Sequence, residues 1–299
     1  MATHSLTARR PTSHAATPRR SRGLGRQIGR MAFLVLAAVI VLYPLAWMIG
    51  TSFKAPTEIA SNVGVLPKEF TPGNYHDGWY GLPGGIAFGR FFTNSLLIAG
   101  CVVVANSVSC LVAAFAFARL KFPLRGMWFS IMIGTLLLPH HVLVVPQYIL
   151  FRTLHWINSP LPLIVPKMLA TEAFFVFLMV QFIRGIPRDL DEAAKIDGCS
   201  VYRVFLHIIL PLSRPALVTT AIFSFIWTWN DYFTQLVYLP DVKSYTVPIG
   251  LRFFLDSSGQ SSIGPMFAMS ALSLIPVFGF FVAFQKLIVE GINTSGLKG

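Results

Sequence analysis

Long runs without any charged side chain constrain this sequence more than any other feature. Residues 31–53 carry no charge, and about 20 apolar residues are enough for a helix to cross the hydrocarbon core of a bilayer. Residues 91–118 and 126–151 are also uncharged, although Pro139 and Pro146 interrupt the second of these runs, and three later runs are strongly apolar with one or two charges each. The predicted spans are 31–51, 93–117, 127–151, 161–183, 216–239 and 266–289. We therefore expect an all-α polytopic membrane protein with six transmembrane helices.

The composition and the distribution of charge support a membrane protein. Hydrophobic residues make up 54% of the chain and charged residues 12%, whereas about 25% charge is typical of soluble domains. The net charge of +12 invites a nucleic-acid partner. Seven basic residues, however, precede the first apolar run: Arg9, Arg10, Arg19, Arg20, Arg22, Arg26 and Arg30. A basic tail of this kind is typical of the cytoplasmic side of a membrane protein, so we expect no nucleic-acid binding.

The N-terminal segment, residues 1–30, is predicted to be a disordered cytoplasmic tail because it is basic, contains no acid and cannot bury a core. A cleaved signal peptide is the competing interpretation. The apolar run that follows is too long for one, and no A-x-A cleavage site comes after it. The cysteines Cys101, Cys110 and Cys199 show neither metal-ligand spacing nor a disulfide framework, so free thiols and no metal are expected.

The orientation follows from lysines and arginines in the short connections. Besides the tail, basic residues gather in the turn 118–126, which holds Arg119, Lys121 and Arg125 without an acid, and in the loop 184–214. With six spans these three segments lie on the same side of the membrane. That side is expected to be the cytoplasm, which places both termini there.

The segment 187–215 is the most polar stretch between the first and last apolar runs, with eight charged residues. Asp189 and Glu192 have the spacing of a capping box, and Gly198 can supply the left-handed residue that ends the short helix. Ser200 is then predicted to cap a second helix. Its apolar face would comprise Val201, Val204, Phe205, Ile208 and Ile209. Ala193 and Ala194, flanked by Leu190, would give the first helix a flat surface for another protein.

The order Glu192-Ala193-Ala194, Asp197-Gly198, Phe205, Ile208 and Leu210-Pro211 resembles the EAA loop of ABC importer permeases. Cys199 departs from that pattern, where Ala is usual. In this family the loop is the cytoplasmic coupling helix that docks into a cleft of the ATP-hydrolysing subunit. The resemblance implies the type I importer fold over 31–299, with a coupling loop at 187–215. It also implies docking roles for Leu190, Glu192, Ala193, Ala194, Asp197 and Gly198.

Further matches extend the resemblance along most of the chain. They are Ser52-Phe53-Lys54, Asn74-Tyr75, Trp229-Asn230-Asp231, the 246–251 stretch T-V-P-I-G-L, Phe284-Gln285-Lys286, Gly291 and the terminal G-L-K-G. Together they resemble the maltose type of sugar permease. This implies a second permease subunit, two ATP-binding subunits, an extracytoplasmic solute-binding protein and a sugar substrate in the bacterial inner membrane. Lys298 and Gly299 are then expected to reach the ATPase interface.

Two acids, Glu172 and Asp231, lie well inside apolar runs. A charge at the centre of a bilayer is costly, so each is expected to face the bundle interior or a watery cavity. For Glu172, a place near the membrane interface with Lys167 is an equal alternative. Trp229, Asn230 and Asp231 are candidates for a sugar path, but an outer helix anchor is a slightly better explanation of W-N-D.

The expected function is that of a transport subunit and not of an enzyme. The sequence contains no G-x-x-x-x-G-K-S/T loop, so ATP hydrolysis is assigned to a partner, and no cofactor is expected. The favoured hypothesis is a binding-protein-dependent ABC importer of a sugar or oligosaccharide. Two alternatives remain: an importer of glycerol phosphate or another polyol, and a secondary transporter driven by an ion gradient, which would need several buried ionisable residues.

Overall fold

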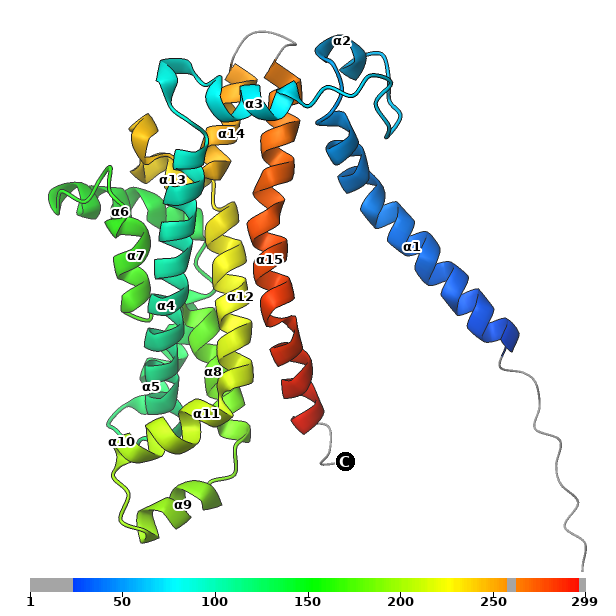
Figure 1. Ribbon diagram of the computed structural model, residues 1–299. Helices are drawn as coiled ribbons and strands as arrows, with labels where there is room; N and C mark the ends of the chain where they lie inside the picture. The colour runs from blue at the N-terminus through cyan, green and yellow to red at the C-terminus, as the bar shows by residue number, and fades with distance from the viewer. Residues whose placement is uncertain (1–23, 257–261, 296–299) are drawn as a thin grey trace, which may run out of the picture. The chain divides into compact units, whose positions relative to one another are not determined.

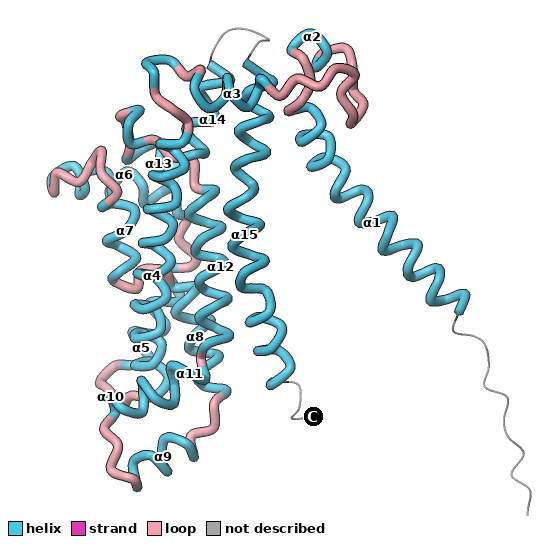
Figure 2. Tube along the Cα trace, viewed as in Figure 1, coloured by secondary structure: helices cyan, strands magenta, loops and turns pink. Residues whose placement is uncertain are grey.

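The computed structural model describes residues 24–256 and 262–295, and within these ranges every regular element is a helix (Figures 1 and 2). The chain divides into two units, residues 1–47 and 48–299. The long helices are α1 (Leu24–Thr51), α4 (Gly89–Arg119), α12 (Arg214–Asn230) and α15 (Ile263–Ser295). The shorter ones are α2 (Pro56–Ile59), α3 (Gly73–Tyr80), η1 (Pro83–Gly85), α5 (Arg125–Thr135), α6 (His140–Thr153), α7 (Leu161–Met168), α8 (Ala173–Gly185), α9 (Asp189–Ile196), α10 (Val201–Val204), η2 (Phe205–Ile209), α11 (Leu210–Leu212), α13 (Phe233–Tyr238), η3 (Val242–Ser244) and α14 (Val247–Asp256).

The predicted all-helical membrane class agrees with the structure, but the count of six spans is not confirmed. The described residues contain four helical segments long and apolar enough to cross a membrane, at Gln27–Thr51, Gly89–Arg119, Leu161–Gly185 and Ile263–Leu287. A fifth results if Val201–Leu212 and Arg214–Asn230, bent by 70°, form one span. The predicted third span is divided into α5 and α6, and Pro139 is the N-cap of the second piece. The predicted fifth span ends early, at Asn230.

The predicted N-terminal tail lies largely outside the described residues, which begin at Leu24. Helix α1 starts there, before the predicted start of the first span at residue 31. Lys298 and Gly299 also lie outside the described residues.

The core of the second unit is built around α4, which packs against α7, α8 and α12, while α12 also packs against α15 (Figure 1). At the end near α9, a cluster of buried apolar side chains joins α4, α8, α9 and α10, and we call it the lower cluster. It includes Ala114, Ala118, Val180, Ile183, Ala194, Val204 and Ile209. A second cluster joins the first turns of α4 to α12, α14 and α15.

A set of hydrogen bonds joins two motifs that lie about 20 residues apart, S-F-K and N-Y. Lys54 is fully buried, and its Nζ donates hydrogen bonds to the carbonyl oxygens of Asn62 (2.7 Å) and Gly64 (2.5 Å). The side-chain amide of Asn74 donates to the carbonyl oxygens of Ser52 and Lys54, both at 2.9 Å. The amide of Asn62 also donates to the carboxylate of Glu58, which lowers the pKa of that group. These bonds fold residues 52–74 back on themselves.

Replacing Lys54 with Met is expected to destabilise this outer segment. The substitution leaves the carbonyl oxygens of Asn62 and Gly64 without the ammonium donor, and a hydrogen bond to a charged group contributes about 1.5–3 kcal/mol. The thermal unfolding midpoint of the detergent-solubilised protein should therefore fall. Lys68→Met is the matched control because the Lys68 side chain is exposed. An equal midpoint for both variants would contradict a structural role for Lys54.

Candidate functional site: a charged loop and a polar cavity

Helix α9 forms where the sequence predicts a short helix, but its start differs. Arg188 is the N-cap and its side chain makes no capping hydrogen bond, while Asp189 is the first helical residue. The predicted capping by Asp189 is therefore wrong. Its carboxylate instead lies in the first turn with those of Asp191 and Glu192, where the positive end of the helix dipole favours negative charge.

The far end of α9 agrees with the prediction. Gly198 has φ +77°, the left-handed conformation that suits a residue without Cβ. Its N–H donates to the carbonyl of Lys195 at 3.0 Å, and the N–H of Cys199 donates to that of Ala194 at 2.9 Å. A residue in this conformation cannot continue a right-handed helix, so α9 ends here and the chain turns into α10.

The two alanines of α9 do not form one flat outer surface. Ala194 is buried in the lower cluster, whereas Ala193 is exposed. The outer surface of α9 consists of Leu190, Glu192, Ala193, Lys195 and Ile196. Ile196 is 87% exposed, an unusual position for a large apolar side chain that the sequence pattern did not single out.

After Gly198 the loop returns to the bundle through α10, η2 and α11 (Figure 1). Ser200 caps α10 as predicted, because its hydroxyl accepts a hydrogen bond from the Arg203 N–H. The next turn, η2, is a π-helix, a wider turn frequent at functional sites. Of the predicted apolar face, Val204 and Ile209 are buried but Val201 is half exposed, so the regular α-helical pattern is not kept.

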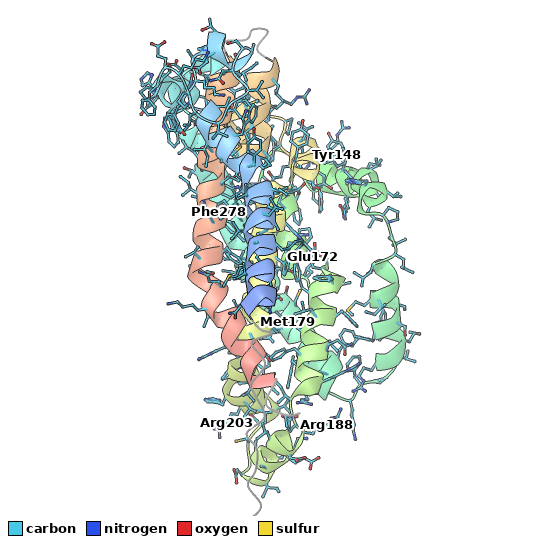
Figure 3. All side chains as sticks on the ribbon, turned by 90° about the vertical axis from the view of Figure 1, so that its right-hand side faces the viewer. Tyr148, Glu172, Met179, Arg188, Arg203 and Phe278 are labelled. Atoms are coloured by element: carbon cyan, nitrogen blue, oxygen red, sulfur yellow. The ribbon has the colours of Figure 1, made fainter. Side chains whose placement is uncertain are left out.

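A cavity of about 650 Å³ lies between α4, α6, α7, α8, α12 and α13. Polar side chains on its wall include Asn106, Thr135, His141, Gln147, Lys167, Thr171, Glu172, Ser224, Thr228, Asn230, Asp231 and Thr234. Aromatic side chains on the same wall are Phe151, Phe175, Trp227, Phe233 and Tyr238. Glu172 stands at a level between Tyr148 in α6 and Arg188 at the start of α9 (Figure 3).

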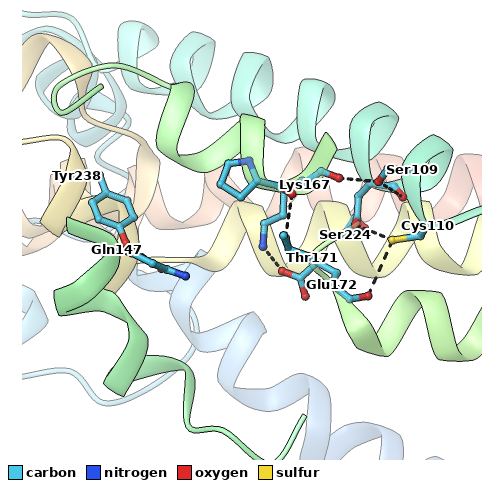
Figure 4. A network of polar contacts seen from close by, with 10 residues as sticks. Ser109, Cys110, Gln147, Lys167, Thr171, Glu172, Ser224 and Tyr238 are labelled. Carbon is cyan, nitrogen blue, oxygen red and sulfur yellow. Dashed lines mark hydrogen bonds and ion pairs between the residues drawn. The ribbon is translucent and has the colours of Figure 1, made fainter. Parts of the chain in front are cut away.

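An unwound segment, residues 169–172, separates α7 from α8 and contributes Thr171 and Glu172 to the cavity wall. Lys167, in the last turn of α7, forms an ion pair with Glu172, the N-cap of α8 (Figure 4). Each side chain is 27% exposed. Glu172 therefore lines the cavity and pairs with Lys167. Its predicted alternative, a place near the membrane interface, stays a prediction.

Neighbouring hydroxyl groups donate hydrogen bonds to backbone carbonyls at the end of α7, next to the unwound segment. Ser109 Oγ, in α4, donates to the Lys167 carbonyl at 2.6 Å, and Thr171 Oγ1 donates to that of Pro166 at 2.9 Å (Figure 4). Non-helical backbone inside a membrane protein needs such partners or a watery cavity. Asn106 joins α4 to α12 by donating to Ser224 Oγ at 2.7 Å.

The W-N-D residues divide between two environments. Asn230 and Asp231 line the cavity, whereas Trp229 is buried away from it and donates from Nε1 to the Ser273 carbonyl at 3.2 Å. Trp229 therefore does not line this cavity, and Trp227 is the tryptophan on its wall. A role of Trp229 in a sugar path stays a prediction. The sequence pattern did not indicate Trp227, His141 or Lys167 as wall residues.

An all-helical membrane bundle with a polar cavity beside a broken span defines a membrane transport component. Residues 81–293 match the model of the family described as binding-protein-dependent transport system inner membrane component. The chain belongs to this family. The resemblance seen in the EAA-like residues is thereby confirmed. The chain is a transport component, and ATP hydrolysis takes place in a partner subunit.

Curated relatives match nearly the whole chain. The galactooligosaccharides transport system permease protein GanQ of Bacillus subtilis is 33% identical over 271 residues, which cover 90% of this chain and 95% of the relative. The trehalose/maltose transport system permease protein MalG of Thermococcus litoralis is 32% identical over 270 residues, covering 89% and 94%. A crystal structure of a bacterial ABC transporter involved in alginate import superposes with a TM-score of 0.76 at 21% identity, covering 90% of this chain and 99% of that one. This structural match supports the fold alone.

Proposed function

We propose that this chain is one membrane subunit of an ATP-driven importer of a neutral sugar or oligosaccharide. The observation that carries the proposal is the cavity, in which Trp227, Asn230 and Asp231 lie on one wall. An aromatic face can stack on a sugar ring, and amide and carboxylate groups bond its hydroxyls. The relatives named above are permeases for trehalose, maltose and galactooligosaccharides, which supports the same substrate class.

The charge of the cavity favours a neutral substrate over glycerol phosphate. Among the described residues that line it, the charged side chains are Lys167, Glu172 and Asp231. Lys167 is already paired with Glu172. Apart from Lys167, the described part of this wall offers no lysine or arginine to bind a phosphate.

A secondary transporter is the less supported alternative. Such a protein needs a relay of ionisable groups through the membrane. In the described part of the cavity wall, one ion pair and Asp231 make up the charged set. The family membership also favours an ATP-driven cycle.

For the arrangement in the membrane, we propose six crossings with both termini and α9 on the cytoplasmic side. The third crossing would consist of α5 and α6 in series, and the fifth of α12 followed by α13. The exposed side of α9, with Leu190, Glu192, Ala193, Asp197 and the turn at Gly198, would dock into an ATPase subunit. The proposed full assembly contains a second permease, two ATP-binding subunits and an extracytoplasmic binding protein, with residues 1–23 and 296–299 on the cytoplasmic side.

Uptake by intact cells tests the proposal. A host strain lacking this gene should lose uptake of one labelled neutral disaccharide or oligosaccharide and regain it when the gene is restored. Depleting ATP should abolish the restored uptake, whereas an uncoupler at constant ATP should leave it largely intact. Uptake that follows the uncoupler would indicate a secondary transporter. Loss confined to labelled glycerol phosphate would indicate the other alternative.

A further inference from the structure

The last residue of α4 is tied to the charged loop by an ion pair that the sequence pattern does not reveal. Arg119 Nε lies 2.9 Å from Asp191 Oδ2, and the two side chains are 5% and 12% exposed. The same guanidinium donates from Nη2 to the Ile186 carbonyl at 2.7 Å. Arg119 therefore contacts both the first turn of α9 and the segment that leads into it.

Apolar packing reinforces this connection. Ala194, three residues after Asp191, is buried in the lower cluster together with Ala118, the neighbour of Arg119. The inner side of α9 is thus fixed to the end of α4 by an ion pair and by close packing. The exposed side, with Glu192, Ala193 and Ile196, remains available to a partner.

Helix α4 extends from the ion pair of Arg119 and Asp191 to the cavity. Val102 and Asn106 line the cavity, and Ser109 donates to the Lys167 carbonyl in the last turn of α7. One helix thus connects the charged loop to the wall on which Lys167 and Glu172 lie. Among the described residues, the ion pairs His76–Asp77 and Lys167–Glu172 do not involve α9.

We infer that the ion pair between Arg119 and Asp191 is a fixed joint, meaning that it keeps the end of α4 and helix α9 in one arrangement so that the two helices move together. Arg119 is then a positioning residue for the coupling of ATP hydrolysis to transport. This inference rests on the proposed docking of α9 to an ATPase subunit. A buried charge without its partner is costly, so the free energy strongly favours the state in which the two side chains stay paired. The planar guanidinium forms an ion pair with the carboxylate while it donates a hydrogen bond to the Ile186 carbonyl, a pair of contacts whose geometry the single ammonium group of a lysine does not match.

The test uses the complete transporter, purified from its host membranes and reconstituted in proteoliposomes with ATP. The quantity measured is the number of sugar molecules taken up per ATP hydrolysed. Asp191→Asn and Arg119→Ala are expected to lower this ratio at least tenfold while ATP hydrolysis continues. The exchange Arg119→Asp with Asp191→Arg should restore at least half of it. Lys121→Ala, which removes an exposed charge just beyond α4, is the control and should keep the wild-type ratio.

Arg119→Lys keeps the charge and is conservative enough to fold if the alanine variant does not. It should assemble in wild-type amounts and show a severalfold lower ratio. Two results would overturn the inference. One is an unchanged ratio in Arg119→Lys. The other is a loss of uptake in a single variant that a smaller amount of assembled complex explains in full. Failure of the proposed function has a different signature, because the wild-type transporter would then show no ATP-dependent uptake.

Discussion

Replacing Glu172 with Leu is expected to reduce strongly the amount of folded protein in the membrane. The substitution leaves the ammonium of Lys167 beside the cavity without its carboxylate partner. A lysine at the centre of a transmembrane helix costs about 2.5–3.5 kcal/mol on insertion scales, and the partial exposure of this pair to the cavity places the expected loss at the lower end. The measurement is the thermal unfolding midpoint and the yield of full-length protein from membranes.

The double variant Lys167→Leu with Glu172→Leu separates stability from transport. Removing both charges should restore the yield, because a paired buried charge can be replaced by apolar groups at little cost. Sugar uptake should stay low if the pair contributes to the path. Glu69→Leu, at an exposed outer glutamate, is the control. A Glu172→Leu protein as stable as this control would show that the pair is not structural.

Replacing Gly198 with Pro is expected to abolish uptake. The residue has φ +77°, which the proline ring cannot adopt, and its N–H donates to the Lys195 carbonyl. The turn that separates α9 from α10 would therefore change, and with it the proposed docking surface. Yield in the membrane and assembly with the second permease should be retained, because Gly198 itself is exposed and lies outside the lower cluster.

A graded series at the same position makes this result specific to backbone conformation. A Cβ at Gly198 would meet no atom within 4 Å, so a side chain there is limited by strain and not by space. Asn tolerates the left-handed region, whereas Ala costs about 1–2 kcal/mol. Uptake should decrease in the order Gly198→Asn, Gly198→Ala, Gly198→Pro. Gly185→Ala is the control, since that Cβ also has open space and the backbone has no positive φ. Normal uptake by Gly198→Pro would contradict the coupling role of the loop.

Features that depend on residues close together in the chain were predictable. The apolar runs indicated the membrane class, Gly198 indicated the left-handed stop and Ser200 the helix cap, because these are governed by local backbone energetics. The prediction for Asp189 was wrong by one position, since Arg188 is the N-cap and its backbone is already helical, with φ −72° and ψ −21°. The run at 127–151 was apolar enough for a span, but Pro139 divides it into two helices.

The sequence by itself determined the membrane class, the charged loop and its turn, and the family to which the chain belongs. Only the tertiary structure decided that Trp227 and not Trp229 faces the cavity, that Lys167 closes onto Glu172 there, and that Arg119 meets Asp191. The physical reason is that apolar runs and turns are encoded within a few residues. The face that a helix presents to a distant helix, in contrast, depends on how all the side chains between them pack.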